Sequence, residues 1–535
     1  MQEHPQNSSY RQGDVPTSLS SGVSIADLAR WWQSTWLLVV LLVASTVPLW
    51  RPGVLPLGDL PGHMGQYAIE LAAPSDPIRQ YFNFHWALIP NIGVDLAMQA
   101  IGPFFGPELG TKLVVTSIPP LTILGFALTG QAFHSRRPAT LPFAATLAYN
   151  QFFLLGFVNF TLSCALAFLA FPLWVWLGRS RNQRLRAGTF VFLSALIWLC
   201  QAFGWAILVL LVFAAEWMAS STRKGLLARS ISAGASCWPL CVPLFPMLLW
   251  QDGTPHNSAE GFGFGNLLLW KLLGLARVLD DRWIALDLIS LIVLLVIVGA
   301  ALRHSRSWLV PPLACGAALL LAAFLLLPKQ MMGANHVDDR MLPYALALAL
   351  LSIRPWDGQQ HRLATIGAVF FGARMIAATI SLWLSYGLYA ADLPALDHVP
   401  RGARLATFIE ESCTLTWAPN HLEHLPALAI VRRQAYSNDQ WAIRGGQLVS
   451  PRAPMARFVD PTQLAVAAPC WSLEGTATLH DRLVALPKSQ FDYVWLIGVS
   501  YRPPELGPSW RLLWSNPTSA LYTMRGFAPV QPAEL

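Results

Sequence analysis

An acidic residue follows the first apolar run of the chain. Asp59 lies in the stretch 58–63, a few residues beyond the apolar segment 35–50. A carboxylate at the mouth of a membrane-embedded bundle is costly to desolvate, so it is kept where it meets water, a cation or a substrate hydroxyl. Such a group can accept a proton from a hydroxyl or bind a divalent cation. Asp59 is therefore the candidate catalytic residue; the alternative is that it only caps the helix that follows.

The residues after Asp59 have helical potential over 61–73. His63, Tyr67 and Glu70 would share one face of this helix, which we expect to lie along the membrane surface. His63 would come one turn after Asp59 and is a candidate for contact with a substrate. The alternative, which is the commoner case for an isolated interfacial histidine, is a hydrogen-bonded packing role.

A second charged cluster lies in a loop just before a late, short apolar segment. It contains Lys329, Asp338, Asp339 and Arg340, on the same predicted side of the membrane as Asp59. An arginine at the start of a short helix can bind a phosphate with two hydrogen bonds, and a lysine can add a point charge. These four residues are candidate substrate-binding residues. The alternative is an internal ion pair among Asp338, Asp339 and Arg340 that fixes the loop.

Three further polar groups lie near span ends. Asn159 and Gln201 could line a pocket, although helix capping or interhelical bonding is the alternative for each. Asp95 lies among interfacial aromatic residues that are mostly belt and turn residues, and a membrane-embedded carboxylate is functional by default. A third outer cluster, in 266–282, is expected to form the solvated face of an amphipathic helix. Its members are Lys271, Arg277, Asp280, Asp281 and Arg282.

Composition defines the class of protein. The 535 residues are 54% hydrophobic and only 12% charged, with 23 Trp, and the mean hydropathy is +0.45. A soluble globule with an ordinary surface does not have this composition, so the chain uses lipid as its solvent. The net charge of +7 comes from short arginine clusters between apolar segments, which leaves no basic stripe for nucleic acid.

Apolar runs predict about 11 transmembrane helices. The predicted spans are 35–50, 112–133, 139–157, 160–178, 188–201, 203–219, 231–250, 283–302, 308–327, 341–353 and 364–386. With the amino terminus in the cytoplasm, every inner loop carries Arg or Lys, whereas the short outer turns near Asn159 and Phe203 carry neither. Because basic loops flank 188–219, we predict two short helices there, with a break at 201–204. The first outer loop is 51–111.

The two ends of the chain are more polar than its middle. Residues 1–34 are predicted to be a disordered cytoplasmic tail without a cleavable signal, and 390–535 a small α/β domain outside the membrane. Buried strands are predicted at 402–409, 491–498 and 519–524. Cys413 and Cys470 lie outside the apolar spans. The sequence allows either a disulfide between them or two free thiols.

Together these features resemble a known superfamily. The acidic first outer loop, the turn 156–160, the two helices around Gln201, the segment 337–343 and the outer carboxyl-terminal domain are similar to the GT-C integral-membrane glycosyltransferases. The narrower similarity is to the bacterial protein mannosyltransferase and aminoarabinose-transferase group. It covers residues 35–386, with a looser similarity in the outer domain.

The resemblance implies a glycosyltransferase of the bacterial inner membrane. A polyprenyl-phosphate sugar would be the donor, and a glycan, lipid or protein of the envelope the acceptor. Asp59 would act on the acceptor or with a divalent cation, and Arg340 with Lys329 would lie near the lipid phosphate. Many relatives have paired acidic residues in the first loop, whereas Gly58 and Leu60 flank Asp59 here; this leaves a metal requirement open.

Two other functions compete with this one. A lipid-carrier flippase or transporter would have charged groups near the middle of the membrane. The ionisable residues of this chain instead gather at one surface, which favours a one-sided active site. A non-catalytic partner in envelope polysaccharide assembly would keep the fold without the reaction.

Overall fold

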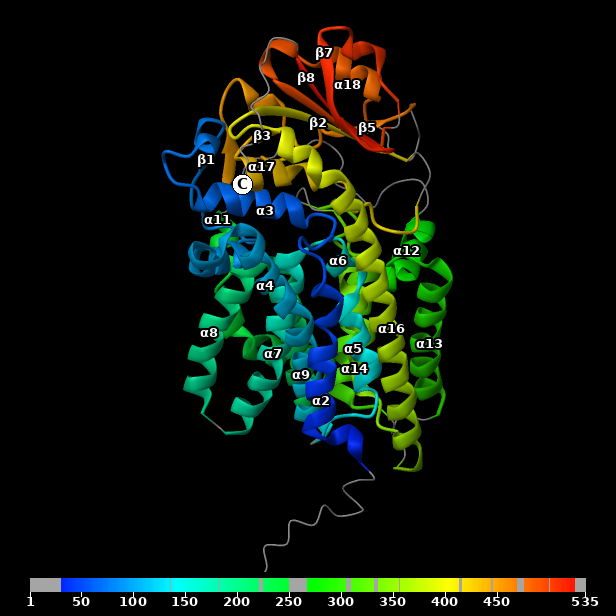
Figure 1. Ribbon diagram of the computed structural model, residues 1–535. Coiled ribbons are helices and arrows are strands. Elements are labelled where there is room, and N and C mark those ends of the chain that lie inside the picture. Colours follow the sequence, from blue (N-terminus) through cyan, green and yellow to red (C-terminus); the bar gives the residue numbers. More distant parts are fainter. Residues whose placement is uncertain are drawn as a thin grey trace, which may run out of the picture.

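The protein is a bundle of helices with a small sheet domain at one end (Figure 1). The computed structural model describes residues 30–134, 136–180, 182–220, 225–249, 267–304, 309–331, 335–355, 357–412, 416–443, 446–468, 476–499 and 501–524. Cys413 and Cys470 lie outside these ranges, as does most of the predicted cytoplasmic tail.

The bundle contains both long and short helices. They are α2 (Thr35–Ala44), α4 (Gly93–His134), α5 (Leu141–Ala145), α6 (Gln151–Leu154), α7 (Val158–Arg179), α8 (Gln183–Cys200), α9 (Ala202–Ala219), α10 (Leu226–Ser236), α11 (Leu244–Leu249), α12 (Leu267–Ala276), α13 (Ile284–His304), α14 (Pro311–Leu326), α15 (Leu342–Ser352) and α16 (Asp357–Asp392). Among the described residues, five helices are long and apolar enough to cross a membrane: α4, α7, α9, α13 and α16.

The structure confirms the predicted break near Gln201 and corrects two other spans. Helices α8 and α9 meet at Gln201, as predicted. The segment 139–157 is not one helix, because the Asn150 side chain accepts hydrogen bonds from the amides of Phe152 and Phe153 and so starts α6 as a separate helix. The segment 231–250 is also broken, between α10 and α11, where Pro239 and Pro243 lack the amide hydrogen that a continuous helix needs.

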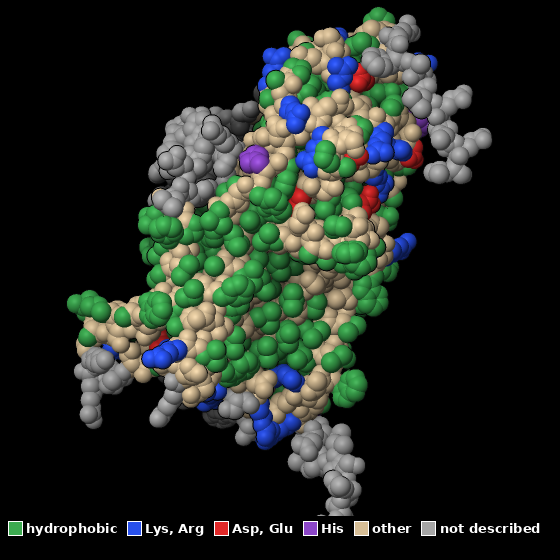
Figure 2. All heavy atoms as spheres, turned by 90° about the vertical axis from the view of Figure 1, so that its left-hand side faces the viewer, with side chains coloured by type: hydrophobic (Ala, Val, Ile, Leu, Met, Phe, Trp, Pro, Cys, Tyr) green, Lys and Arg blue, Asp and Glu red, His purple; other side chains and the backbone are tan. Residues whose placement is uncertain are grey.

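Apolar side chains cover the bundle between two charged ends. Figure 2 shows a band of hydrophobic side chains on one face, with Lys and Arg at the lower end and charges of both signs around the sheet domain. Many large apolar residues of α13 and α16 are exposed, among them Ile289, Val296, Val369 and Ile376. An exposed apolar surface of this extent is what a bilayer solvates.

The first outer loop forms two helices above the bundle. Helix α3 (Leu60–Leu71) confirms the predicted helix after Asp59 and lies across the top of the bundle, below the sheet domain (Figure 1). Helix α4 is kinked at Gly106, whose φ is +71°. Because a residue with a Cβ rarely adopts that backbone conformation, Gly106 separates the outer part of α4 from the part that crosses the bundle.

The outer domain is built on a six-stranded sheet. Its strands are β2 (Arg404–Glu411), β3 (Tyr436–Ser437), β5 (Leu464–Val466), β6 (Tyr493–Ile497), β7 (Trp510–Ser515) and β8 (Ser519–Met524). The order is β3-β2-β6-β8-β7, with β5 also paired to β2. Strand β2 runs parallel to β3, β5 and β6, and β8 runs antiparallel to its neighbours. All three predicted strands are confirmed, and the small α/β domain with them.

The outer domain is fastened to the first outer loop. Strand β1 (Phe82–Phe84) of the loop pairs antiparallel with β4 (Val449–Pro451). Arg432 of α17 (Leu428–Arg433) bonds both carboxylate oxygens of Glu108, at 2.8 and 3.1 Å. Helix α17 also packs on α3. The outer domain therefore lies directly over the helix that Asp59 begins.

Candidate active site

Asp59 is placed by a close contact between two loops. Its amide nitrogen donates to the carbonyl of Leu155 at 2.8 Å. The next residue, Gly156, has φ +83°, and a Cβ there would lie 2.8 Å from the Asp59 nitrogen. Only glycine allows this approach. The Asp59 carboxylate makes no capping hydrogen bond to α3, although the residue stands at the N-cap position. The capping alternative therefore does not account for Asp59.

The carboxylate of Asp59 faces His424, which sequence reasoning did not identify. Oδ1 of Asp59 lies 4.0 Å from Nε2 of His424, and Oε1 of Glu423 lies 3.9 Å from the same nitrogen. On the other side of the ring, Nδ1 of His424 lies 3.2 Å from Oδ1 of Asp439. Asp439 is fully buried and follows β3. The imidazole is thus held between carboxylates from two parts of the chain.

Burial and charge set the protonation states of this group. Burial raises the pKa of Asp59 to about 6, although the His424 imidazolium opposes that rise. Burial alone would lower the pKa of His424, but Asp439, Glu423 and Asp59 together raise it to about 10. At neutral pH the pair is therefore a carboxylate beside an imidazolium. The side chain of Asp59 keeps 28% of its exposure while that of His424 keeps 3%, so the carboxylate is the open end of the pair.

Aromatic rings pack around His424. The Trp441 ring lies 4.5 Å from the ring of His424 and 4.9 Å from that of His63, between centroids. A Cβ on Gly62 would come within 2.6 Å of Trp441, so the glycine lets the indole pack directly on α3. His63 is buried, and burial lowers its pKa to about 3. A neutral, buried histidine fits a packing role, but not the hydrogen-bonded one expected, because its Nδ1 has no hydrogen-bond partner among the described residues.

Arg340 lies in an aromatic cage rather than in an ion pair. Its guanidinium carbon is 4.8 Å from the ring centroids of Phe157 and Phe203 and 5.3 Å from that of Phe160. One guanidinium nitrogen donates to the Asn335 carbonyl at 2.9 Å. In the described part of the chain no carboxylate pairs with Arg340. Burial lowers its pKa to about 10, so it stays charged at neutral pH.

The two carboxylates before Arg340 have other partners. Asp338 accepts from Lys271 at 2.6 Å, and Asp339 lies 2.9 Å from Nδ1 of His336. The structure therefore replaces the ion pair considered for Asp338, Asp339 and Arg340 by two different pairs. The expectation that Lys271 belongs to a solvated face was wrong. The Lys271 side chain is buried against α14, and its ammonium also donates to the carbonyls of Phe324 and Leu327. Asp280 and Asp281 are buried too.

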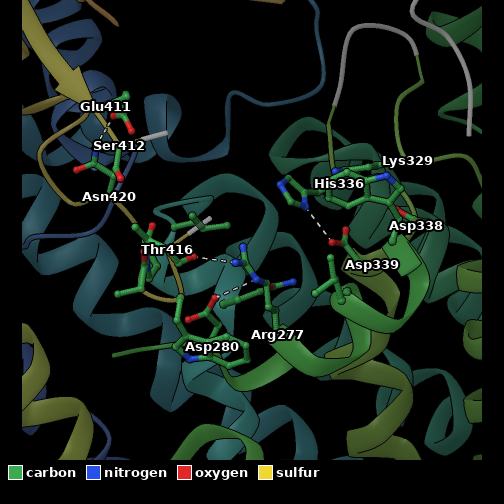
Figure 3. Close-up of a pocket in the computed structure, with 18 residues that line it drawn as sticks. Arg277, Asp280, Lys329, His336, Asp338, Asp339, Glu411, Ser412, Thr416 and Asn420 are labelled. Carbon is green, nitrogen blue, oxygen red and sulfur yellow. Dashed lines mark hydrogen bonds and ion pairs between the residues drawn. The ribbon is translucent and has the colours of Figure 1, made fainter. Parts of the chain in front are cut away.

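A cavity of about 270 Å³ is lined by three residues of the second cluster, Lys329, Asp338 and Asp339, whereas Asp59 and Arg340 are not among its lining residues. Figure 3 shows Lys329, His336, Asp338 and Asp339 on one side, with residues of the outer domain across from them. The lining includes Arg277, Asp280, Lys329, His336, Asp338, Asp339, Glu411, Thr416 and Asn420. The ammonium of Lys329 lies 3.7 Å from the Trp270 ring centroid and forms no ion pair with a carboxylate of the described chain. Leu155, whose carbonyl holds Asp59, also lines the cavity.

The side chains of Asn159 and Gln201 lie outside the cavity and form hydrogen bonds with backbone groups. The Asn159 amide donates to the Asn91 carbonyl at 2.9 Å and accepts from the Val94 amide at 2.7 Å, which fixes the start of α4. The Gln201 carbonyl oxygen accepts from the Ala202 amide at 2.6 Å and caps α9. Both contacts are of the capping kind considered for these residues, and neither residue lines the cavity.

The residues around Asp59 do not fit a resident metal ion. Two ligands bonded to one tetrahedral ion lie roughly 3.4 Å apart, whereas Asp59 and Glu423 each lie 3.9 to 4.0 Å from the His424 nitrogen. No group of three or more His, Cys, Asp or Glu residues within the described ranges is arranged to hold a metal.

Comparison with known proteins finds structural relatives only. No family model matches the chain, and no curated protein does. The chain is similar to ArnT from Cupriavidus metallidurans in the apo state, with 11% identity and a TM-score of 0.50, over 92% of this chain and 98% of that one. For the same protein bound to undecaprenyl phosphate the values are 13%, 0.47, 93% and 99%.

A third similarity is to the mycobacterial arabinofuranosyltransferase AftD, with 15% identity and a TM-score of 0.41, over 92% of this chain and 41% of that one. At these identities the similarity to apo ArnT shows a shared fold. The chain thus has the fold of ArnT, and the predicted resemblance is confirmed at the level of the fold.

Proposed function

We propose that this protein is a glycosyltransferase that moves a sugar from a polyprenyl-phosphate donor to an envelope acceptor, by inverting transfer at the outer face of the bacterial inner membrane. The observation that carries the proposal is the Asp59–His424 pair, which the bond from the Asp59 amide to Leu155 places beside a cavity lined by Lys329, a lysine without an ion pair among the described residues. A base, a cavity and cations for a leaving phosphate are what this chemistry needs. ArnT, whose fold the chain shares, has been solved with undecaprenyl phosphate.

Asp59 is proposed as the general base. A carboxylate with a pKa of about 6 is ionised at neutral pH, yet it is a stronger base than an exposed aspartate. It would accept the proton of the acceptor hydroxyl as the oxygen attacks the anomeric carbon. The bond from that carbon to the phosphate oxygen breaks on the opposite face, so the configuration inverts. The electron pair leaves with the polyprenyl phosphate.

Fixed positive charges are proposed to stabilise the leaving phosphate. Lys329 lines the cavity and packs on the Trp270 ring. Arg340 does not line the cavity, but it is close enough for its charge to lower the pKa of Asp59. Neither Lys329 nor Arg340 forms an ion pair with a carboxylate of the described residues. Cations held in place before the reaction stabilise the developing charge without reorganisation, and a cage of aromatic rings excludes water from Arg340.

His424 is proposed as a positioning residue. Its imidazolium lies beside Asp59 and keeps the pKa of that carboxyl lower than burial alone would make it. Asp439 bonds Nδ1 of His424 on the side of the ring away from Asp59, which fixes the position of the imidazolium charge. Since no metal fits here, the imidazolium supplies the positive charge beside the base, and no step of the mechanism involves a metal.

The direct test is transfer of radiolabel from a panel of polyprenyl-phosphate sugars to endogenous membrane acceptors. We compare the wild type with Asp59→Asn at matched protein levels, and with Asp397→Asn as an exposed-carboxylate control, since 72% of the Asp397 side chain is exposed. Loss of transfer in Asp59→Asn alone supports the proposal, with a decrease of roughly 10²- to 10⁴-fold for a missing general base. No transfer by the wild type from any donor would instead favour the carrier or partner functions.

A further inference from the structure

A group of buried oxygen atoms without partners lies between α3 and the first turn of α4. Glu70 lies one turn after Gln66 and Tyr67 on α3, at spacings of four and three, and Asp95 of α4 bonds Gln66. All four side chains are at most 7% exposed. Glu70 is 11 residues after Asp59, which is roughly 16 Å along a helix. This cluster is therefore separate from the candidate active site.

Only one hydrogen bond is made within this cluster. Nε2 of Gln66 donates to Oδ1 of Asp95. Five oxygen atoms remain buried with no hydrogen-bond partner: Gln66 Oε1, Tyr67 OH, both carboxylate oxygens of Glu70 and Asp95 Oδ2. The bond to Gln66 places Asp95 against the part of α3 that carries Tyr67 and Glu70, and Asp95 raises the pKa of both. Buried oxygens without partners cost free energy unless something binds them.

The cluster contains two carboxyl groups, and no cation of the described chain is paired with either. Burial and the neighbouring Asp95 raise the pKa of Glu70 to about 8, so without a bound cation this carboxyl holds its proton at neutral pH. Among the described residues, neither Glu70 nor Asp95 forms an ion pair. The closest guanidinium, that of Arg79, donates to the backbone carbonyls of Glu70 and Ala72, at 3.4 and 2.6 Å, instead of to a carboxylate. Two carboxylates buried together without a counter-ion are unfavourable.

We propose that Gln66, Tyr67, Glu70 and Asp95 bind a hard divalent cation of the calcium type, which joins the end of α3 to the start of α4. All the free donors are oxygens, which hard cations prefer, and softer metals would require nitrogen or sulfur. Calcium fits better than magnesium because the site is buried: magnesium keeps several waters, whereas calcium accepts a shell of protein oxygens. The cation would fix the helix that carries Asp59 at its start.

Equilibrium dialysis of the full-length protein in detergent tests this site. The protein is stripped with EDTA, dialysed against radiolabelled calcium, and its thermal unfolding is followed with and without calcium. We expect one equivalent of bound calcium and a higher unfolding temperature in its presence. Glu70→Gln and Asp95→Asn should each weaken binding by roughly tenfold or more, and the double variant should bind none.

The control is Asp59→Asn, which should bind calcium as the wild type does. Calcium binding that depends on Asp59, or that persists in the double variant, would overturn the proposal because the ion would then lie elsewhere. A wild type that binds no calcium would overturn it as well, and that result does not require any variant to fold. If the two carboxylates simply share a proton, the variants will raise the unfolding temperature without any response to calcium, which also contradicts the site.

Discussion

The imidazole of His424 and the carboxylate of Asp59 face each other at 4.0 Å, although one residue follows the first apolar segment and the other lies in the outer domain. Asp439 holds the far side of the ring at 3.2 Å. The candidate base therefore receives its charge environment from a domain outside the bundle. The outer domain is part of the site and not only a cover over the cavity.

The first prediction concerns the pH dependence of transfer. Asp59 must be ionised to accept a proton, so activity should rise with pH through the pKa of about 6. His424→Gln removes the imidazolium that opposes the raised pKa, and the acidic limb of the pH profile should then move to higher pH. The control is His63→Gln, because His63 is already neutral with a pKa of about 3. An unchanged acidic limb in His424→Gln would contradict the proposed role.

Replacing Arg340 should lower turnover more than protein level. Arg340→Met keeps an apolar side chain against Phe157, Phe160 and Phe203 and removes only the charge. Loss of one fixed donor to a developing charge decreases turnover by roughly 100-fold or more. Turnover at saturating donor and thermal unfolding are measured side by side. A matched control is Arg186→Met, since Arg186 also stacks on an aromatic ring, that of Trp174, and should change stability only.

Lys329 should act on the donor rather than on the fold. Its ammonium lines the cavity and has no carboxylate partner in the described chain. Lys329→Met is expected to raise the KM for the polyprenyl-phosphate donor, while Lys329→Arg, which keeps the charge, retains most of the affinity. Inhibition by free polyprenyl phosphate measures the same contact. Equal inhibition of the wild type and Lys329→Met would show that Lys329 does not meet the phosphate.

Asp338 and Lys271 should behave as a structural pair. Both side chains are more than nine-tenths buried, and their charged atoms are 2.6 Å apart. Lys271→Met leaves a buried carboxylate unpaired and should cost about 3–5 kcal/mol of stability. The double variant Lys271→Met/Asp338→Leu should recover most of this loss, which thermal unfolding in detergent can measure. A double variant no more stable than Lys271→Met would show that the pair is not the reason for the loss.

Asn159 should affect folding and not substrate affinity. Its amide bonds the backbone of Asn91 and Val94 at the start of α4. Asn159→Ala is expected to cost roughly 1–2 kcal/mol, because it leaves a helix start without its cap. The KM for donor and acceptor should stay at the wild-type value. A rise in the KM for donor or acceptor without a loss of stability would show that Asn159 contacts the substrate.

The amino-acid sequence alone determined the class of protein and many of its elements. Composition requires lipid as the solvent, and apolar runs place most of the helices. The basic loops on both sides of 188–219 predict the break at Gln201. Short, largely apolar runs place strands β2, β6 and β8, which are buried along most of their length. The helix after Asp59 was predicted because these signals are local: each depends on residues within one or two turns of each other.

Only the tertiary structure decided which charges are free and which are paired. Lys271 looks like a solvated lysine in the sequence, yet it lies buried beside Asp338, 67 residues away. Arg340 follows two aspartates directly but pairs with neither, because each has a partner from another turn or helix. The group of His424, Asp439 and Asp59 has no motif in the sequence. These side chains meet because the outer domain packs on α3, and contacts between residues so far apart in the chain leave no periodic signal to predict them.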